Sequence, residues 1–173
     1  MTLVQACDVP LNSLLSRYQD GVGYADCYLA VLPFAVTQQS FIEAFYTSPL
    51  FKVERTLLQV LAAKPATDAD VRLLAAGKAQ IFSAWRVESQ SDAELLLADF
   101  TGRTRSWLRA TPVDGPQKSA GTRLYFGSAV LPRRSGAGAQ SGMGWPFHAL
   151  LGFHRLYARL LLGAAARRVR PAD

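Results

Sequence analysis

Cysteine, histidine and acidic residues are scarce in this chain of 173 residues, and each scarcity excludes something. The two cysteines, Cys7 and Cys27, are too few for a disulfide scaffold. Together with the two histidines they show none of the spacings of a zinc site, so we expect no metal and no cofactor. Beyond Asp114 the next acidic residue is Asp173, which leaves the C-terminal third of the chain basic.

Long uninterrupted apolar runs are also missing. A membrane-spanning helix needs about 20 consecutive apolar residues, and Arg155 and Arg159 interrupt the best candidate. The first residues lack the basic start, apolar run and cleavage site of a signal peptide. We therefore expect a cytoplasmic protein without stable membrane insertion.

The net charge of +6 is spread unevenly along the chain. Up to Asp114 there are 10 Lys and Arg against 12 Asp and Glu, and from Gly115 onward there are 9 against 1. A basic half is compatible with nucleic acid, anionic lipid or an acidic ligand. Arginines at the end of a C-terminal helix also stabilise its dipole. We adopt this second interpretation and expect no nucleic-acid partner.

What the chain does have is an apolar C-terminal segment from Phe147 to Arg168. Its few polar and small residues recur every three or four positions and share one narrow stripe of an α-helix. A helix that is apolar around most of its girth is buried on several sides. The sequence therefore predicts a long helix, from about Trp145 to Arg168, around which the protein is built.

Upstream, the hydrophobic period divides the chain into further elements. These are a strand at 24–33, helices that begin after Thr37, Ser48 and Thr67, and strands at 81–88, 94–100, 103–111 and 122–131. Because the strands run together instead of alternating with helices, the predicted class is α+β. We expect a single domain over 1–173, with a candidate N-terminal arm at 1–23 and a flexible loop at 133–144.

The order of strand, helix pair, antiparallel meander and closing helix resembles the helix-grip superfamily of START-like and polyketide-cyclase-like proteins. The segments LLGFHRLYARLLL, GRTRSWL and LYFGSAV are similar to those of bacterial members whose function is not known. The resemblance covers roughly residues 24 to 168. It implies a curved antiparallel sheet of five or more strands wrapped around the C-terminal helix, with an apolar cavity between them. Five strands are clear in the sequence, and Thr2 to Cys7 is a candidate for another.

The candidate ligand site is centred on His154, which shares a helix face with Leu151 and Leu161. A histidine on an apolar face is either a neutral core residue or a group that binds a ligand or transfers protons. Small residues such as Gly127 stand among bulky ones, which indicates either close backbone packing or an open pocket. We expect an enclosed apolar pocket. Its predicted ligand-binding residues are His154, Tyr157, Ser128, Trp85, Phe126 and Leu151.

A second candidate site is a strand face with alternating basic and aromatic residues: Arg103, Arg105, Trp107 and Arg109. Anion and nucleic-acid sites interleave such residues. The alternatives are a solvated outer face on which arginine stems cover Trp107, and an inward face that receives a carboxylate.

Three functions follow from these features. We expect binding of a hydrophobic small molecule or lipid in the pocket. The first alternative is a cyclase- or hydratase-like enzyme with His154 as acid or base, favoured if His154 meets a carboxylate in the cavity. The second is an interaction module that uses the Arg103–Arg109 face. Ligand identity, catalysis and oligomeric state stay open at this point.

Overall fold

A computed structural model gives the fold over most of the chain. The described residues are 3–19, 23–53, 65–113, 121–131 and 145–171, and for 145–153 only the backbone is described. The loop expected at 133–144 lies outside them.

The elements agree with the order read from the sequence. They are β1 (Val4–Ala6), a 3-10 turn (Ser16–Tyr18), β2 (Tyr24–Leu32), α1 (Gln38–Tyr46), α3 (Asp68–Ala75), β3 (Ile81–Phe82), β4 (Trp85–Gln90), β5 (Glu94–Asp99), β6 (Thr104–Pro112), β7 (Thr122–Val130) and α4 (Trp145–Ala166). Residues 49–53 are also helical. The seven strands form one antiparallel sheet in the order β1-β2-β7-β6-β5-β4-β3. The predicted α+β class, with an antiparallel sheet and a C-terminal helix, is confirmed.

Two strands were less clear in the sequence. Thr2 to Cys7 does contain a strand, β1, which pairs with β2 at the edge of the sheet. The single strand expected at 81–88 is divided into β3 and β4 at Ser83, whose φ of 53° lies in the left-handed region. A residue in that region turns the chain, so the two short strands pair with each other as a hairpin.

The helix starts predicted from the sequence are confirmed by their capping contacts. The Thr37 side chain accepts a hydrogen bond from the Ser40 amide, and Thr67 forms a reciprocal capping box with Asp70. The Ser48 hydroxyl likewise accepts from the Phe51 amide, at 3.3 Å. These contacts satisfy amide groups that have no partner within the helix.

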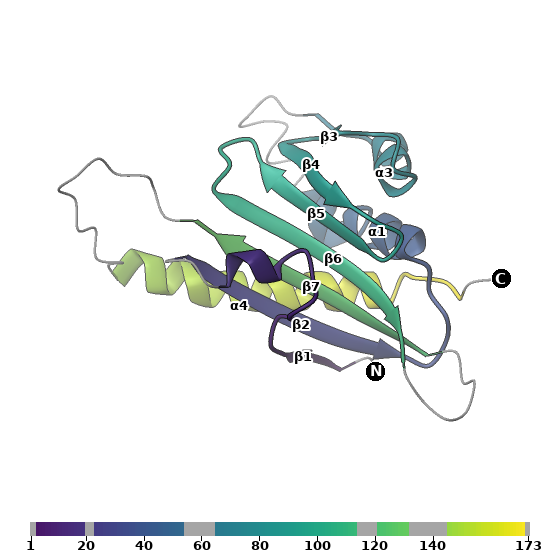
Figure 1. Ribbon diagram of the computed structural model, residues 1–173, viewed down its shortest axis with the longest axis horizontal. Helices are drawn as coiled ribbons and strands as arrows, with labels where there is room; N and C mark the ends of the chain where they lie inside the picture. The colour runs from purple at the N-terminus through teal and green to yellow at the C-terminus, as the bar shows by residue number, and fades with distance from the viewer. Residues whose placement is uncertain (1–2, 20–22, 54–64, 114–120, 132–144, 172–173) are drawn as a thin grey trace.

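The two faces of the sheet are covered differently (Figure 1). Helices α1 and α4 lie on the face that we call inner, with α4 against β2 and β7 and α1 against β6. The N-terminal arm, residues 7–19, crosses the opposite, outer face. The sheet is thus the middle layer, between the helices and the arm.

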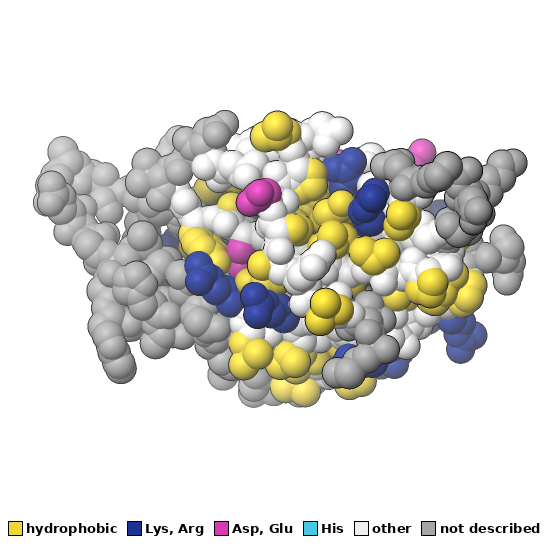
Figure 2. Space-filling model, turned by 90° about the horizontal axis from the view of Figure 1, so that it is seen from below, with side chains coloured by type: hydrophobic (Ala, Val, Ile, Leu, Met, Phe, Trp, Pro, Cys, Tyr) yellow, Lys and Arg dark blue, Asp and Glu magenta, His cyan; other side chains and the backbone are white. Residues whose placement is uncertain are grey.

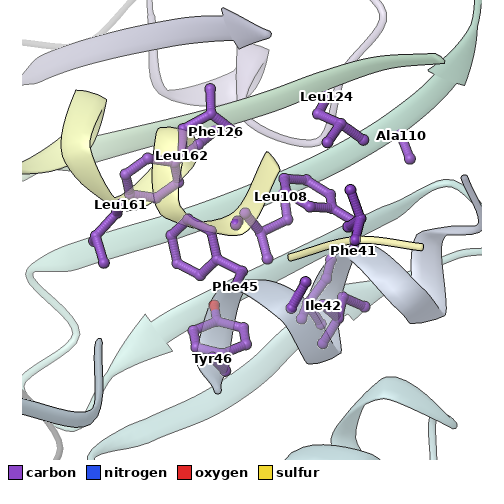
Figure 3. Packing of buried hydrophobic residues seen from close by; sticks show 14 of the residues in the cluster. Phe41, Ile42, Phe45, Tyr46, Leu108, Ala110, Leu124, Phe126, Leu161 and Leu162 are labelled. Carbon is purple, nitrogen blue, oxygen red and sulfur yellow. The ribbon is translucent and has the colours of Figure 1, made fainter. Parts of the chain in front are cut away.

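The larger core lies between the inner face and the helices (Figure 3). Phe45 of α1 lies toward Phe126 of β7, with ring centroids 4.8 Å apart, and toward Leu161 of α4. Phe41 lies nearer to Leu108 and Leu124. The apolar pattern of the sequence predicts that Leu161, Phe126, Trp85 and Leu151 are buried together. Leu161 and Phe126 are 3% and 5% exposed, and Trp85 packs partly buried against the same cluster. The side chain of Leu151 is outside the described residues.

Helix α4 is less buried than its composition suggests. Ala158, Leu161 and Leu162 are buried, but Leu156 and Leu160 are 58% and 51% exposed. The prediction of burial on several sides is therefore wrong for this part of the helix. The reason is that α4 lies against one face of the sheet with α1 along one flank, which leaves its other side uncovered by the described chain. Among the residues that the structure describes, no helix is long and apolar enough to cross a membrane.

Candidate functional site

A cavity of about 590 Å³ lies between α4, the end of α1 with the helical residues 49–53, and the inner face of the sheet. Its lining is mainly apolar, with polar groups from β6, β7 and α4. The lining residues are Phe45, Leu50, Phe51, Val53, Trp85, Thr104, Arg105, Ser106, Phe126, Ser128, His154, Leu156, Tyr157, Leu160 and Leu161.

Five of the six predicted ligand-binding residues line this one cavity: His154, Tyr157, Ser128, Trp85 and Phe126. The side chain of the sixth, Leu151, is outside the described residues. That they bind a ligand stays a prediction.

The cavity is not enclosed by the described chain, contrary to our expectation. Of its lining residues, Val53 is 60% exposed, and Leu156 and Leu160 are the exposed leucines of α4. Seen from below, the surface of the molecule carries hydrophobic side chains gathered among Lys and Arg side chains (Figure 2). An apolar cavity with exposed apolar side chains at its rim gives a ligand a way in.

A row of polar side chains crosses the inner face at one end of the cavity. Asp26 of β2 is paired in register with Ser128 of β7, which is paired in turn with Ser106 of β6. Because residues opposite each other point to the same side of a sheet, all three face the helices. Ser106 lies 3.4 Å from the hydroxyl of Tyr46, which continues the row.

His154 of α4 reaches this row. Its Nε2 atom lies 2.7 Å from the Ser128 hydroxyl, which donates to Asp26 Oδ1 at 2.6 Å. The same nitrogen is 3.8 Å from Asp26 Oδ2. Histidine, serine and carboxylate thus form one connected group, with Ser128 between the other two.

Two tyrosines of β2 hold the carboxylate from the other side. The hydroxyls of Tyr24 and Tyr28 donate to Asp26 Oδ2 at 3.1 and 3.2 Å. Arg155 and Arg159 of α4 lie over their rings, each 5.6 Å from the ring centroid. Burial, followed by the influence of Asp26, raises the pKa of Tyr28, and burial also raises that of Tyr24. Both phenols therefore remain protonated donors at neutral pH.

Asp26 is a carboxylate at neutral pH. Burial acts to raise its pKa, but His154, Ser128 and Tyr24 together outweigh burial and hold the pKa below its usual value. An ionised carboxylate only accepts hydrogen bonds, so Ser128 donates to it and accepts from His154 Nε2, which carries the hydrogen.

This proton arrangement decides the chemistry of the group. A nucleophilic serine needs a neighbouring nitrogen free to take its proton, and Nε2 already holds one. Ser128 is therefore an anchor between Asp26 and His154. Nδ1 of His154 has no hydrogen-bond partner in the described part of the chain.

Residues Arg103, Arg105, Trp107 and Arg109 lie on the outer face of the sheet, and the arm covers much of that face. Trp107 is fully buried beneath Leu15 and Val9 of the arm. Arg105 forms an ion pair with Glu88 at 2.6 Å. Arg103 is exposed. The structure thus does not bring the four residues together as one open surface, and an indole that is buried offers no ring to a stacking partner.

The outer face also holds a buried acid. Glu94 accepts from the Trp107 indole at 2.7 Å and from the Leu14 amide at 2.8 Å, with Arg109 Nε 3.8 Å away. Glu88 in turn accepts from the Tyr18 hydroxyl. These contacts fasten the arm to the sheet.

Gly127 belongs to this outer face. A Cβ atom there would lie 2.5 Å from Leu15 Cδ2 and 2.9 Å from the backbone oxygen of Asp26. The missing side chain makes room for the arm, so of the two alternatives for Gly127 the structure shows close packing and not an open pocket. Two residues of strand β7 line the cavity, and both are neighbours of Gly127 in the sequence: Phe126 and Ser128.

Asp26, Tyr24 and Tyr28 are the site residues that sequence reasoning missed. Their alternation in YADCYLAVL places all three on one strand face, and that was a usable signal. What the sequence did not reveal is that β2, the first long strand, pairs with β7, the last. Among the described residues, no group of three or more His, Cys, Asp or Glu side chains is arranged to hold a metal ion.

Comparison of the chain with models of protein families, with curated proteins and with solved structures finds no match in any of the three.

Proposed function

We propose that the protein binds a hydrophobic small molecule in the cavity beside α4. The observation that carries this proposal is a mainly apolar cavity of about 590 Å³ that ends on the polar group of Ser128, His154 and Asp26. Small-molecule sites are typically about 300–1,000 Å³, apolar, with few polar groups that fix orientation. The cavity has both properties.

The polar end defines the ligand more closely. Asp26 already accepts hydrogen bonds from Ser128 and two tyrosines, so it does not need a cation from the ligand. Thr104, Ser106, Ser128 and His154 are polar residues that line the cavity beside the apolar side chains. The proposed ligand therefore has an apolar body and one neutral or anionic oxygen group, as a fatty acid or a ketone does.

Trp85 adds a donor to the same wall. Its indole Nε1 is buried and has no hydrogen-bond partner among the described residues. A buried donor without a partner costs roughly 1–3 kcal/mol. A ligand acceptor that reaches this atom removes that cost.

The proposal includes the helix-grip architecture and a cytoplasmic location. The element order supports it: apart from β1, the chain runs through one strand, helices, an antiparallel meander and a closing helix. In that architecture the sheet curves around α4, and the cavity lies between them. The edge strand β1 and the arm are additions to it.

The experiment is a fluorescence titration with 1-anilinonaphthalene-8-sulfonate, whose emission rises in apolar sites. We expect saturable binding of one dye molecule per chain and displacement by dodecanoic acid. Leu160→Glu places a charge at the rim and should weaken binding at least tenfold, because the carboxylate loses hydration when the site is filled.

Leu73→Glu is the matched control. Leu73 is a helical leucine with 46% exposure that lies on α3, away from the cavity. The Leu73→Glu variant should bind dye as the wild type does. If the wild type binds no dye saturably, or if both variants lose binding equally, the cavity is not a ligand site.

Acid–base catalysis on the bound ligand is the second candidate function. Contact of His154 with the Ser128–Asp26 pair at the cavity is the specific observation in its favour, since acid–base catalysis needs an imidazole held within reach of the bound ligand. The reaction class would be proton transfer next to a carbonyl, which hydratase- and cyclase-type reactions share.

Exchange of the α-protons of 2-nonanone in heavy water, followed by NMR, tests this candidate without knowledge of the natural substrate. We expect the wild type to accelerate exchange and His154→Gln to reduce it to the buffer rate while dye binding persists. Exchange at the buffer rate in the wild type would leave ligand binding as the function.

A further inference from the structure

The two cysteines of the chain lie opposite each other at the edge of the sheet. The register of β1 and β2 pairs Ala6 with Tyr28, which sets Cys7 against Cys27. The Cys7 amide donates to the Cys27 carbonyl at 3.0 Å, and the two Sγ atoms are 3.4 Å apart. Hydrogen-bonded antiparallel pairs have Cα atoms about 5.5 Å apart, within the range that a disulfide spans.

The two thiols differ in exposure. Cys7 is half-buried where the chain leaves β1 for the arm, and Cys27 is buried under the arm. The hydrogen bond from Cys27 outweighs burial and lowers the pKa of Cys7, whereas that contact and burial raise the pKa of Cys27. A thiol that is accessible and more readily ionised is the one that a soluble reagent reaches first.

We propose that Cys7 and Cys27 are a thiol–disulfide exchange site that takes a small-molecule disulfide, such as oxidised glutathione, and closes into a clasp between the arm and β2. The Cys7 thiolate attacks one sulfur of glutathione disulfide, and one glutathione leaves as a thiolate. The Cys27 sulfur, 3.4 Å away, then attacks the Cys7 sulfur and displaces the second glutathione, which takes up the Cys27 proton. Two protein thiols are oxidised while one disulfide is reduced to two thiols.

The position of the clasp gives it a physical effect. The cysteines are 20 residues apart in sequence, and the chain between them includes the arm that covers Trp107. A cross-link stabilises mainly because it restricts the unfolded chain. In a reducing compartment the clasp is open, and it closes when the compartment becomes oxidising.

The test is a redox titration of the purified protein in buffers of reduced and oxidised glutathione. Each sample is quenched with acid, alkylated with N-ethylmaleimide in urea so that the buried Cys27 also reacts, and read as intact mass. We expect two populations, one with both thiols alkylated and one with neither, and few chains that carry glutathione. Closure should raise the midpoint of thermal unfolding by about 5–10 °C.

Two variants define the order of the steps. Cys27→Ala should stop at the mixed disulfide on Cys7, and Cys7→Ser should stay unmodified at Cys27 because that thiol is buried. The wild-type titration needs neither variant to fold. Accumulation of the glutathione adduct in the wild type, disulfides between chains, or an internal disulfide that forms only in denaturant would overturn the proposal.

Discussion

The inner and outer faces of the sheet are built from the same strands but differ in how their polar side chains are covered. On the outer face the arm covers the sheet and Glu94 is satisfied by the Leu14 amide and the Trp107 indole. On the inner face His154 and Ser128 border a cavity with exposed leucines at its rim. A sealed face stabilises a protein, and an unsealed apolar face is available for binding. This difference is the reason why we propose ligand binding on the inner face.

The largest expected effect comes from breaking the outer seal. Trp107→Ala should lower the free energy of unfolding by about 3–5 kcal/mol, because it leaves a cavity under the arm and takes a donor from Glu94. Urea denaturation measures this change. Dye binding at the cavity should persist in the folded fraction, since Trp107 lies on the other face.

Leu161→Ala is the inner-face counterpart of that change. It should lower the free energy of unfolding by about 2–5 kcal/mol. It should also alter the affinity for dye, because Leu161 lines the cavity. If both substitutions change dye affinity equally, the two faces are not functionally distinct.

A smaller effect is expected from Gly127→Ala, which tests how closely the arm packs. The added methyl group meets Leu15 Cδ2 at 2.5 Å, the Asp26 backbone oxygen at 2.9 Å and Trp107 Cε3 at 3.0 Å. Overpacking of this kind costs about 1–3 kcal/mol. The measurement is the urea midpoint of the variant. An unchanged midpoint would mean that the arm does not press on β7.

The smallest expected effect depends on pH and concerns the polar row. Since the pKa of Asp26 is lower in the folded protein, its ionisation adds stability above the unfolded-state pKa of about 3.9, and that stability is lost as the pH falls through the folded-state pKa. Asp26→Asn should therefore be about 1 kcal/mol less stable at pH 7.

The difference between wild type and Asp26→Asn should shrink as the pH falls below about 4. Urea denaturation at a series of pH values measures it. A difference that stays constant down to the lowest pH at which both proteins fold would show that the charge of Asp26 contributes nothing.

Much of the fold could be predicted because its signals are local. The capping residues Thr37 and Thr67 depend only on neighbours in sequence, and so does the two-residue period of the strands that follow. The division of one expected strand into β3 and β4 at Ser83 was missed, because no sequence pattern indicates reliably that a serine adopts a left-handed backbone conformation. The exposed leucines of α4 were missed because composition describes the whole girth of a helix and does not tell which side a neighbour covers.

Only part of the candidate site could be predicted from the sequence. His154 and Ser128 stood out as polar residues among apolar ones, and they do meet. Asp26 was missed because its contact with Ser128 spans 102 residues and depends on the pairing of β2 with β7. The orientation of the arginine strand was likewise decided by the arm, whose position over Trp107 no local pattern reveals.

Native mass spectrometry of the protein with added dodecanoic acid tests the central claim, ligand binding on the inner face, most directly. We expect the wild type and Leu73→Glu to gain the mass of one fatty acid saturably, and Leu160→Glu to stay at its bare mass. A wild type that stays bare at every fatty-acid concentration, or three proteins that take up several molecules without saturation, would contradict the claim.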